Sequence, residues 1–171
     1  MKGATSWRTP PGVFEALHRE FGFNVDAAAT DDNALVIPHT PRCSPLACNM
    51  AHGRFYTADT DGTKPEHYGE GDRVFCNPPY SPASVLYRFI ETASKTSREQ
   101  GATWVMLLNA TTTDTRWFHD FIWDRRLHRP REGVEVRFLK GRIAFHGVLN
   151  TPIPSPRYSN MVVVFHPRGD A

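Results

Sequence analysis

Three features are scarce or missing in this sequence of 171 residues, and each absence excludes a class of protein. Only three cysteines occur, an odd number, so a disulfide framework is not predicted. No apolar segment follows Met1 and Lys2, so we expect no signal peptide. No apolar run approaches the roughly 18 residues that a membrane helix needs. We therefore expect a cytoplasmic protein with reduced thiols and no membrane partner.

A strong net charge is also missing, but the existing charge is unevenly distributed. The formal net charge is +2 at pH 7. Residues 116–142 hold eight Lys or Arg and four Asp or Glu, whereas residues 1–72 hold six and ten. A polyanion such as DNA would be attracted to residues 116–142. Four cations of this region fit either a DNA contact or a solvated surface: Arg125, Arg126, Arg129 and Arg131.

The most distinctive feature is the tetrapeptide Asn77-Pro78-Pro79-Tyr80, which follows a short apolar run. Both prolines fix φ and lack an N–H, and Pro78 favours an extended Asn77. A planar amine placed at this stiff turn can donate one hydrogen to the Asn77 side-chain oxygen and one to the Pro78 carbonyl. Tyr80 offers a ring on which an extruded base can stack. These residues predict a pocket for methylating an exocyclic amino group, in preference to a rigid loop that only ends a strand.

Apolar periodicity predicts alternating strands and helices. We expect one helix from its N-cap Thr9 to Gly22, a second from Ser81 to Gly101, and an amphipathic helix near Trp117. This alternation predicts an α/β fold with a mostly parallel sheet, an antiparallel edge and helices on both faces. No linker is evident, so residues 1–171 are expected to form a single catalytic domain. Strands are expected near residues 23–26, 74–76, 102–108, 134–138 and 161–165, with residues 30–72 irregular.

The chain resembles the phage-type DNA N6-adenine methyltransferase (Dam) family over about residues 7–165, in the family's order. The Asn77-Pro78-Pro79-Tyr80 sequence looks like motif IV of amino-group methyltransferases that use S-adenosyl-L-methionine. The resemblance implies a Rossmann-like methyltransferase sheet, N6-adenine methylation of DNA and a phage or prophage setting in a bacterial host. The segments that carry it are 7–11, 21–30, 55–57, 61–62, 75–81, 105–108, 114–119, 137–142 and 161–165.

The resemblance also implies roles for individual residues. Ligands in such sheets bind at the carboxyl ends of strands, which places Asp26 and Asn77 on one rim. Asp26 is expected to accept from the cofactor's ammonium, although it also suits a helix N-cap. Asp61 is expected to bind the ribose hydroxyls, although Asp61-Gly62 is also a turn signal. The expected site comprises catalytic Asn77, Pro78, Pro79 and Tyr80; cofactor-binding Trp7, Thr9, Asp26, Ala27, Asp61 and Asn77; and DNA-binding Arg116, Lys140 and Arg142.

The chain departs from the family pattern in two places. Residues 36–53 have the character of an inserted loop, and residues 109–113 lack the Pro and Arg that usually occur there. In addition, no Gly-x-Gly accompanies Asp26. The inserted loop contains His39, Cys43, Cys48 and His52, all of them soft metal ligands. Their spacing matches no zinc pattern, so we predict no metal site.

Two other classes of function remain open from the sequence. The same pocket could accept cytosine N4 or the amide of a protein glutamine, because both present a planar amine. A non-catalytic nucleic-acid-binding protein could also retain the fold without binding the cofactor.

Overall fold

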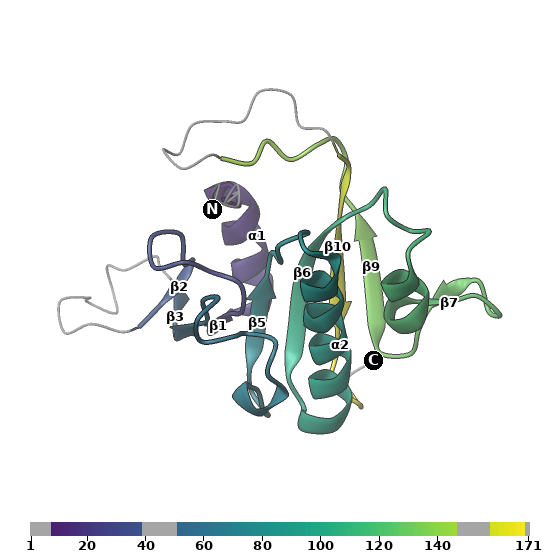
Figure 1. The fold of residues 1–171 in the computed structure, drawn as a ribbon, viewed down its shortest axis with the longest axis horizontal. Coiled ribbons are helices and arrows are strands. Elements are labelled where there is room, and N and C mark those ends of the chain that lie inside the picture. The colour runs from purple at the N-terminus through teal and green to yellow at the C-terminus, as the bar shows by residue number, and fades with distance from the viewer. Residues whose placement is uncertain (1–7, 39–50, 147–157, 170–171) are drawn as a thin grey trace.

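The computed structural model describes residues 8–38, 51–146 and 158–169 of the chain (Figure 1). A six-stranded sheet forms its centre, with the strand order β4-β1-β5-β6-β10-β9. The strands are β1 Val25–Asp26, β4 Arg54–Phe55, β5 Arg73–Cys76, β6 Thr103–Asn109, β9 Val134–Phe138 and β10 Asn160–Phe165. The helices are α1 Pro11–Phe21 and α2 Ala83–Gln100, with short helical turns η1 Pro65–His67 and η2 Phe118–Ile122.

Five of the six strands run in one direction. Strands β4, β1, β5 and β6 pair in parallel, and β10 is antiparallel to both β6 and β9. Strand β9 therefore runs the same way as the first four, and β10 is reversed between β6 and β9. The predicted mostly parallel sheet with antiparallel pairing towards one edge is confirmed. The reversed strand lies one position inside the edge, and β9 is the edge strand.

The two helices cover opposite faces of the sheet, as the sequence predicted. Alternate residues of a strand point to opposite faces. Val74 and Met106 pack in one apolar cluster with residues of α2, whereas Phe75 and Val105 pack in a second cluster with Phe14 of α1. The rings of Phe14 and Phe75 meet edge to face, with centroids 5.1 Å apart. Burial of apolar side chains on both faces explains why β5, β6 and β10 are almost continuously apolar.

The helix ends agree with the prediction at their C-termini and differ at their N-termini. Gly22 and Gly101 adopt left-handed conformations, with φ of 65° and 77°, and end α1 and α2. The N-cap positions are Pro10 and Pro82, and neither makes a side-chain capping hydrogen bond. The predicted N-cap at Thr9 is therefore wrong, because the Thr9 hydroxyl contacts another segment, described below.

The region from 30 to 72 is more regular than predicted. Val36–Ile37 (β2) pairs in parallel with Ala51–His52 (β3), so the two ends of the expected insertion at 36–53 lie side by side. Residues 39–50 lie outside the described residues. Strand β4 follows directly and adds an edge to the main sheet next to β1.

The helix predicted near Trp117 is shorter and wider than expected. It is a five-residue π-helical turn, η2, that ends where the Trp123 N–H donates to the Phe118 carbonyl. It leads into a small hairpin of β7 Trp123–Asp124 and β8 Arg129–Pro130. Trp117, Phe118 and Ile122 are buried, so the apolar pattern was correctly assigned to the core. Within the described ranges, no helix is both long and apolar enough to cross a membrane.

Gly62 brings the turn after β4 against the end of β1. A Cβ at this position would lie 2.0 Å from the Ala27 carbonyl oxygen. The Gly62 carbonyl also accepts a hydrogen bond of 2.6 Å from the buried Tyr68 hydroxyl. Only glycine allows this close backbone approach.

We expect Gly62→Ala to lower the free energy of unfolding by about 3 kcal/mol or more, because backbone rather than a flexible side chain must move. Gly69→Ala is the matched control, since a Cβ there meets nothing within 4 Å. Urea unfolding of both variants measures the difference. Equal stability of the two variants would contradict the close approach.

Candidate active site

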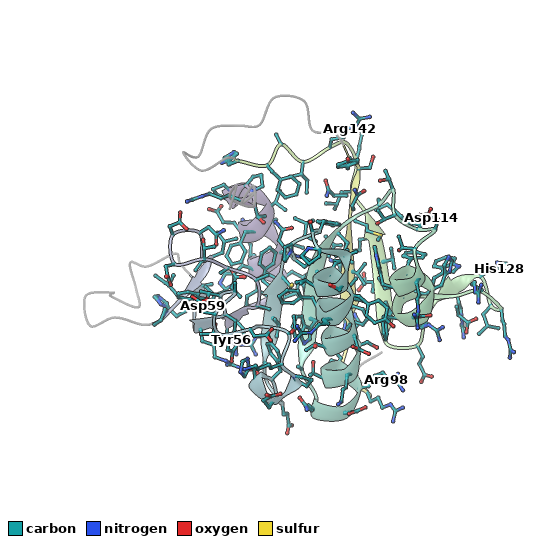
Figure 2. All side chains as sticks on the ribbon, in the orientation of Figure 1. Tyr56, Asp59, Arg98, Asp114, His128 and Arg142 are labelled. Atoms are coloured by element: carbon teal, nitrogen blue, oxygen red, sulfur yellow. The ribbon has the colours of Figure 1, made fainter. Side chains whose placement is uncertain are left out.

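The turn that follows β5 lies at the carboxyl edge of the parallel strands, the upper edge in Figure 1. Asn77 directly follows β5, and residues 77–82 lead into α2. Helix α2 then runs away from this edge, towards Arg98 at the bottom of Figure 2. The turn from β5 to α2 therefore presents Asn77, Pro78, Pro79 and Tyr80 together at the rim.

Asn77 is tied to the segment that precedes α1. Its Nδ2 donates a 3.2 Å hydrogen bond to Oγ1 of the buried Thr9. Within the described part of the chain, no group donates to Asn77 Oδ1. The amide nitrogen is thus engaged, and the oxygen is the end that can accept from a ligand.

Tyr80 is anchored at its hydroxyl while its ring stays accessible. The hydroxyl oxygen accepts a short hydrogen bond from the backbone N–H of Asn109, at the end of β6. The residue is 40% exposed. The neighbouring Pro78 is buried and Pro79 is exposed. A tethered ring with a free surface can stack a planar group at low entropic cost, because it is already held in place.

Asp26 is a buried carboxylate that shapes the turn after β1. Oδ1 accepts from the Ala28 N–H at 3.3 Å, and Oδ2 accepts from the Leu35 N–H at 3.0 Å. Burial raises the pKa of Asp26 from 3.8 to about 6, although the two backbone hydrogen bonds act in the opposite direction. No helix begins here, so the carboxylate caps a loop. Ala27 is also buried, and its N–H donates to the Phe75 carbonyl at 2.9 Å.

Asp61 lies near the same edge, because Gly62 contacts Ala27. Its Oδ1 accepts from the Thr63 N–H and hydroxyl, and its Oδ2 is 3.0 Å from Arg88 Nη2 on α2. The Thr63 hydroxyl hydrogen bond is the main cause that holds the pKa of Asp61 below its usual value. Asp61 also has a left-handed φ of 52°. The turn interpretation of Asp61-Gly62 is therefore correct, and the carboxylate already has partners.

Two contributors to this rim were missed by sequence reasoning. The Arg8 backbone pairs with His146 through hydrogen bonds of 2.9 and 3.0 Å, and its guanidinium lies 2.6 Å from Asp32. Asn109 holds Tyr80 through its backbone. Arg8 could have been found as the neighbour of Thr9, but a backbone donor such as Asn109 leaves no signal in side-chain identity. Trp7 lies outside the described residues.

The three predicted DNA-binding residues occupy two places on the surface. Arg116 is 82% exposed in its side chain, pairs with Asp120 at 3.0 Å and lies over the Tyr87 ring of α2 at 5.6 Å. Lys140 and Arg142 are exposed beyond β9, where Gly141 bends the chain with φ of 84°. This segment crosses the upper edge, with Arg142 near its top in Figure 2, and continues to the His146–Arg8 bridge. The segment therefore does not form a tight turn between two strands of the sheet.

Cys76 packs in the core, and of the four candidate metal ligands only His52 lies within the described residues. Cys76 is fully buried beneath α2, and burial raises the pKa of its thiol well above the usual value. His39, Cys43 and Cys48 lie outside the described residues. Across the ranges that are described, no three His, Cys, Asp or Glu side chains converge as a metal site would need.

Comparison with models of protein families supplies the deciding observation. The model described as DNA N-6-adenine-methyltransferase (Dam) matches residues 43–167, which include the Asn77-Pro78-Pro79-Tyr80 rim, β6, β9 and β10. The chain belongs to this Dam family. Membership supports DNA adenine N6 methylation over the cytosine and glutamine alternatives. A search of curated proteins found no match. Thr9, Asp26 and Ala27 lie before the matched range, so the family match does not include them.

We expect the buried Asp26 to make stability depend on pH in a defined direction. A carboxyl whose pKa is raised on folding stabilises the fold fully below about pH 4 and loses that contribution as pH rises through about 6. The loss corresponds to about 3 kcal/mol. The free energy of unfolding of the wild type should therefore fall relative to that of Asp26→Asn between about pH 4 and 7.5, as measured by urea titrations. A constant difference would show that Asp26 titrates normally.

Proposed function

We propose that this member of the Dam family transfers the methyl group of S-adenosyl-L-methionine to N6 of adenine in DNA, at the rim around Asn77. The observation that carries the proposal is the hydrogen bond from Asn77 Nδ2 to Thr9, which leaves Oδ1 to accept from a substrate amine. The accessible ring of Tyr80 lies three residues further along the same turn. An oxygen acceptor beside a stacking surface suits a flipped purine.

The rim's own residues account for orienting the amine. One N6 hydrogen is given to Asn77 Oδ1 and the other to the Pro78 carbonyl, which has no neighbouring N–H to compete for it because Pro79 lacks one. Two acceptors localise the nitrogen lone pair, which in free adenine is delocalised into the ring, and direct it at the methyl group. Tyr80 holds the base plane by stacking, worth about 1–3 kcal/mol. The proton released from nitrogen can leave through the same acceptors.

The chemistry of the nearby groups fits S-adenosyl-L-methionine, which supplies an electrophilic methyl on sulfur when bound. Thr9 accepts from Asn77 and keeps its own hydroxyl proton to donate to the cofactor's carboxylate. Asp26 has lone pairs left after two backbone contacts and can meet an ammonium at the same edge. Ala27 follows Asp26 in the chain, and Gly62, next to Asp61, lies against the Ala27 carbonyl. We propose Ala27, Asp61 and Trp7 as the remaining cofactor-binding residues. A bound ammonium would also lower the raised pKa of Asp26.

We further propose that residues 1–171 act as one catalytic domain in a bacterial cytoplasm, on phage or prophage DNA, with Arg116, Lys140 and Arg142 contacting the duplex. These statements extend the family resemblance. In Figure 2 Arg142 lies beyond the upper edge of the sheet, and we propose that the backbone of an extruded nucleotide passes there.

The deciding experiment incubates the purified protein with methyl-labelled S-adenosyl-L-methionine and adenine-rich DNA, followed by nucleoside mass spectrometry. Labelled N6-methyladenine supports the proposal. Labelled N4-methylcytosine would overturn the base assignment but keep the pocket. Absence of label with the cofactor bound would indicate another substrate, and absence of cofactor binding would favour a non-catalytic DNA-binding protein.

We expect Asn77→Ala to reduce turnover on the order of 10²-fold or more, because one of the two acceptors for the amine is lost. The dissociation constant for S-adenosyl-L-methionine should change much less, since the other proposed cofactor contacts remain. Single-turnover methylation and equilibrium binding measure the two effects separately. Retention of full activity would rule out the assigned role of Asn77.

Thr9 provides a sharper test of how Asn77 is oriented. Thr9→Val keeps the shape of the side chain but removes the acceptor for Asn77 Nδ2, so we expect turnover to fall about 5- to 10-fold. Thr9→Ser keeps the hydroxyl and should retain most of the activity. If the two variants lose activity equally, the hydroxyl does not orient Asn77.

A further inference from the structure

The hairpin of β7 and β8 concentrates unpaired positive charge on a projection from the fold. Its turn, residues 125–128, is exposed throughout, and the chain carries Arg125, Arg126, Arg129 and Arg131 within seven residues. Figure 2 places His128 far to one side of the sheet, beyond η2. The proposed chemistry at Asn77 uses none of these residues.

Five arginines elsewhere in the fold have carboxylate partners. Ion pairs link Arg8 to Asp32, Arg54 to Asp72, Arg88 to Asp61, Arg116 to Asp120, and Arg137 to Glu20 and Glu135. In the described ranges, the side chains of Arg125, Arg126 and Arg129 form no ion pair and no hydrogen bond. Four further arginines in the described ranges also form no ion pair, but they are spread over α1, β5, α2 and the segment after β10: Arg19, Arg73, Arg98 and Arg168. The hairpin is therefore distinguished by several unpaired guanidinium groups on one turn.

The only carboxylate inside the hairpin is used to shape its turn. Asp124 Oδ1 accepts from the backbone N–H groups of Arg126 and Leu127, at 2.8 and 3.1 Å. These backbone hydrogen bonds are the main cause that lowers the pKa of Asp124. His128 completes the turn with a left-handed φ of 50°. The turn is thus held in a defined shape while its cations point outward.

The base of the hairpin is fixed to the catalytic part of the fold. The Arg131 N–H donates to the Ile122 carbonyl and its guanidinium donates to the His119 carbonyl, both at 2.8 Å. The Trp123 ring stacks on Phe118, and Phe121 meets Tyr87 of α2 at 5.3 Å. Helix α2 begins just after Tyr80. A connected set of contacts therefore joins the hairpin to the rim.

Leu127 at the tip is 58% exposed, an unusual position for a leucine between arginines. A nucleic-acid surface offers phosphates for the guanidinium groups and sugar faces for such an apolar side chain. An enzyme that extrudes a base must also grip the duplex away from the extruded nucleotide.

We propose that the β7–β8 hairpin is a second DNA contact, in which Arg125, Arg126 and Arg129 bind backbone phosphates flanking the target. This inference deepens the proposed function and depends on DNA being the substrate. Phosphate contacts are independent of sequence, so the hairpin supplies affinity and register instead of base recognition.

The test measures binding of a labelled short DNA duplex by fluorescence anisotropy over a range of salt concentrations. We expect the triple variant Arg125→Ala, Arg126→Ala, Arg129→Ala to reduce the slope of log affinity against log salt by about 2 to 3, since each phosphate contact contributes about 0.9. The control is Lys95→Ala, Arg98→Ala, Arg168→Ala, which removes the same charge from exposed positions away from the hairpin. A triple Arg→Lys variant of the hairpin should keep most of the slope.

The possible outcomes separate this inference from the proposed function. If the wild type methylates DNA but the hairpin and control variants show equal slopes of log affinity against log salt, the hairpin contact alone is overturned. Wild type that does not bind DNA overturns both. The triple hairpin variant could also keep the wild-type slope of DNA affinity against salt while losing binding to polyglutamate. That result would indicate that the hairpin binds an acidic protein, and it would also overturn the inference. Circular dichroism and methylation of a single-stranded oligonucleotide at low salt check that the variant remains folded and active.

Discussion

The candidate site depends on the hydrogen bond between Asn77 and Thr9. These residues are 68 positions apart, and the bond joins the segment before α1 to the turn after β5. It is possible only because α1 packs on the face of the sheet to which Phe75 points, so that Thr9 reaches the rim from that side. One neutral hydrogen bond contributes about 1 kcal/mol to stability. Its larger effect is to decide which end of the Asn77 amide faces a ligand.

The residue beside Thr9 extends this connection to two further segments. Arg8 pairs through its backbone with His146 and through its side chain with Asp32. The dipeptide Arg8-Thr9 therefore contacts the loop after β1, the turn after β5 and the segment after β9. The buried Asp26 carboxylate holds the loop after β1 by accepting hydrogen bonds from two of its backbone N–H groups. The residues that we propose on the cofactor side and on the substrate side are thus positioned by one short stretch of extended chain.

Much of the fold could be predicted from local pattern, whereas much of the site could not. Gly22 and Gly101 end helices because they accept a left-handed φ, and the apolar runs of β6 and β10 indicate strands buried on both faces. The π-helical turn at 118–122 was missed because its apolar pattern also fits an α-helix. The roles of Thr9 and Asp61 as partners of Asn77 and Arg88 follow from contacts across 68 and 27 residues, which spacing does not encode. Tyr80 was singled out for its ring, but the backbone donor that anchors it has no sequence signature.

Because the reversed strand β10 lies between β6 and β9, strand β9 can join the sheet only after β10 has been synthesised. Among the strands that the structure describes, β9, at 134–138, pairs only with β10, at 160–165, and β10 in turn pairs with β6. During synthesis, residues 134–138 leave the ribosome before the strand that attaches them to the rest of the sheet exists. The segment that carries Lys140 and Arg142 is attached to the sheet at one end by β9. It therefore cannot take its place until β10 has been synthesised. A nascent chain is therefore expected to acquire strand β9 and the basic segment after it only once residue 165 has emerged.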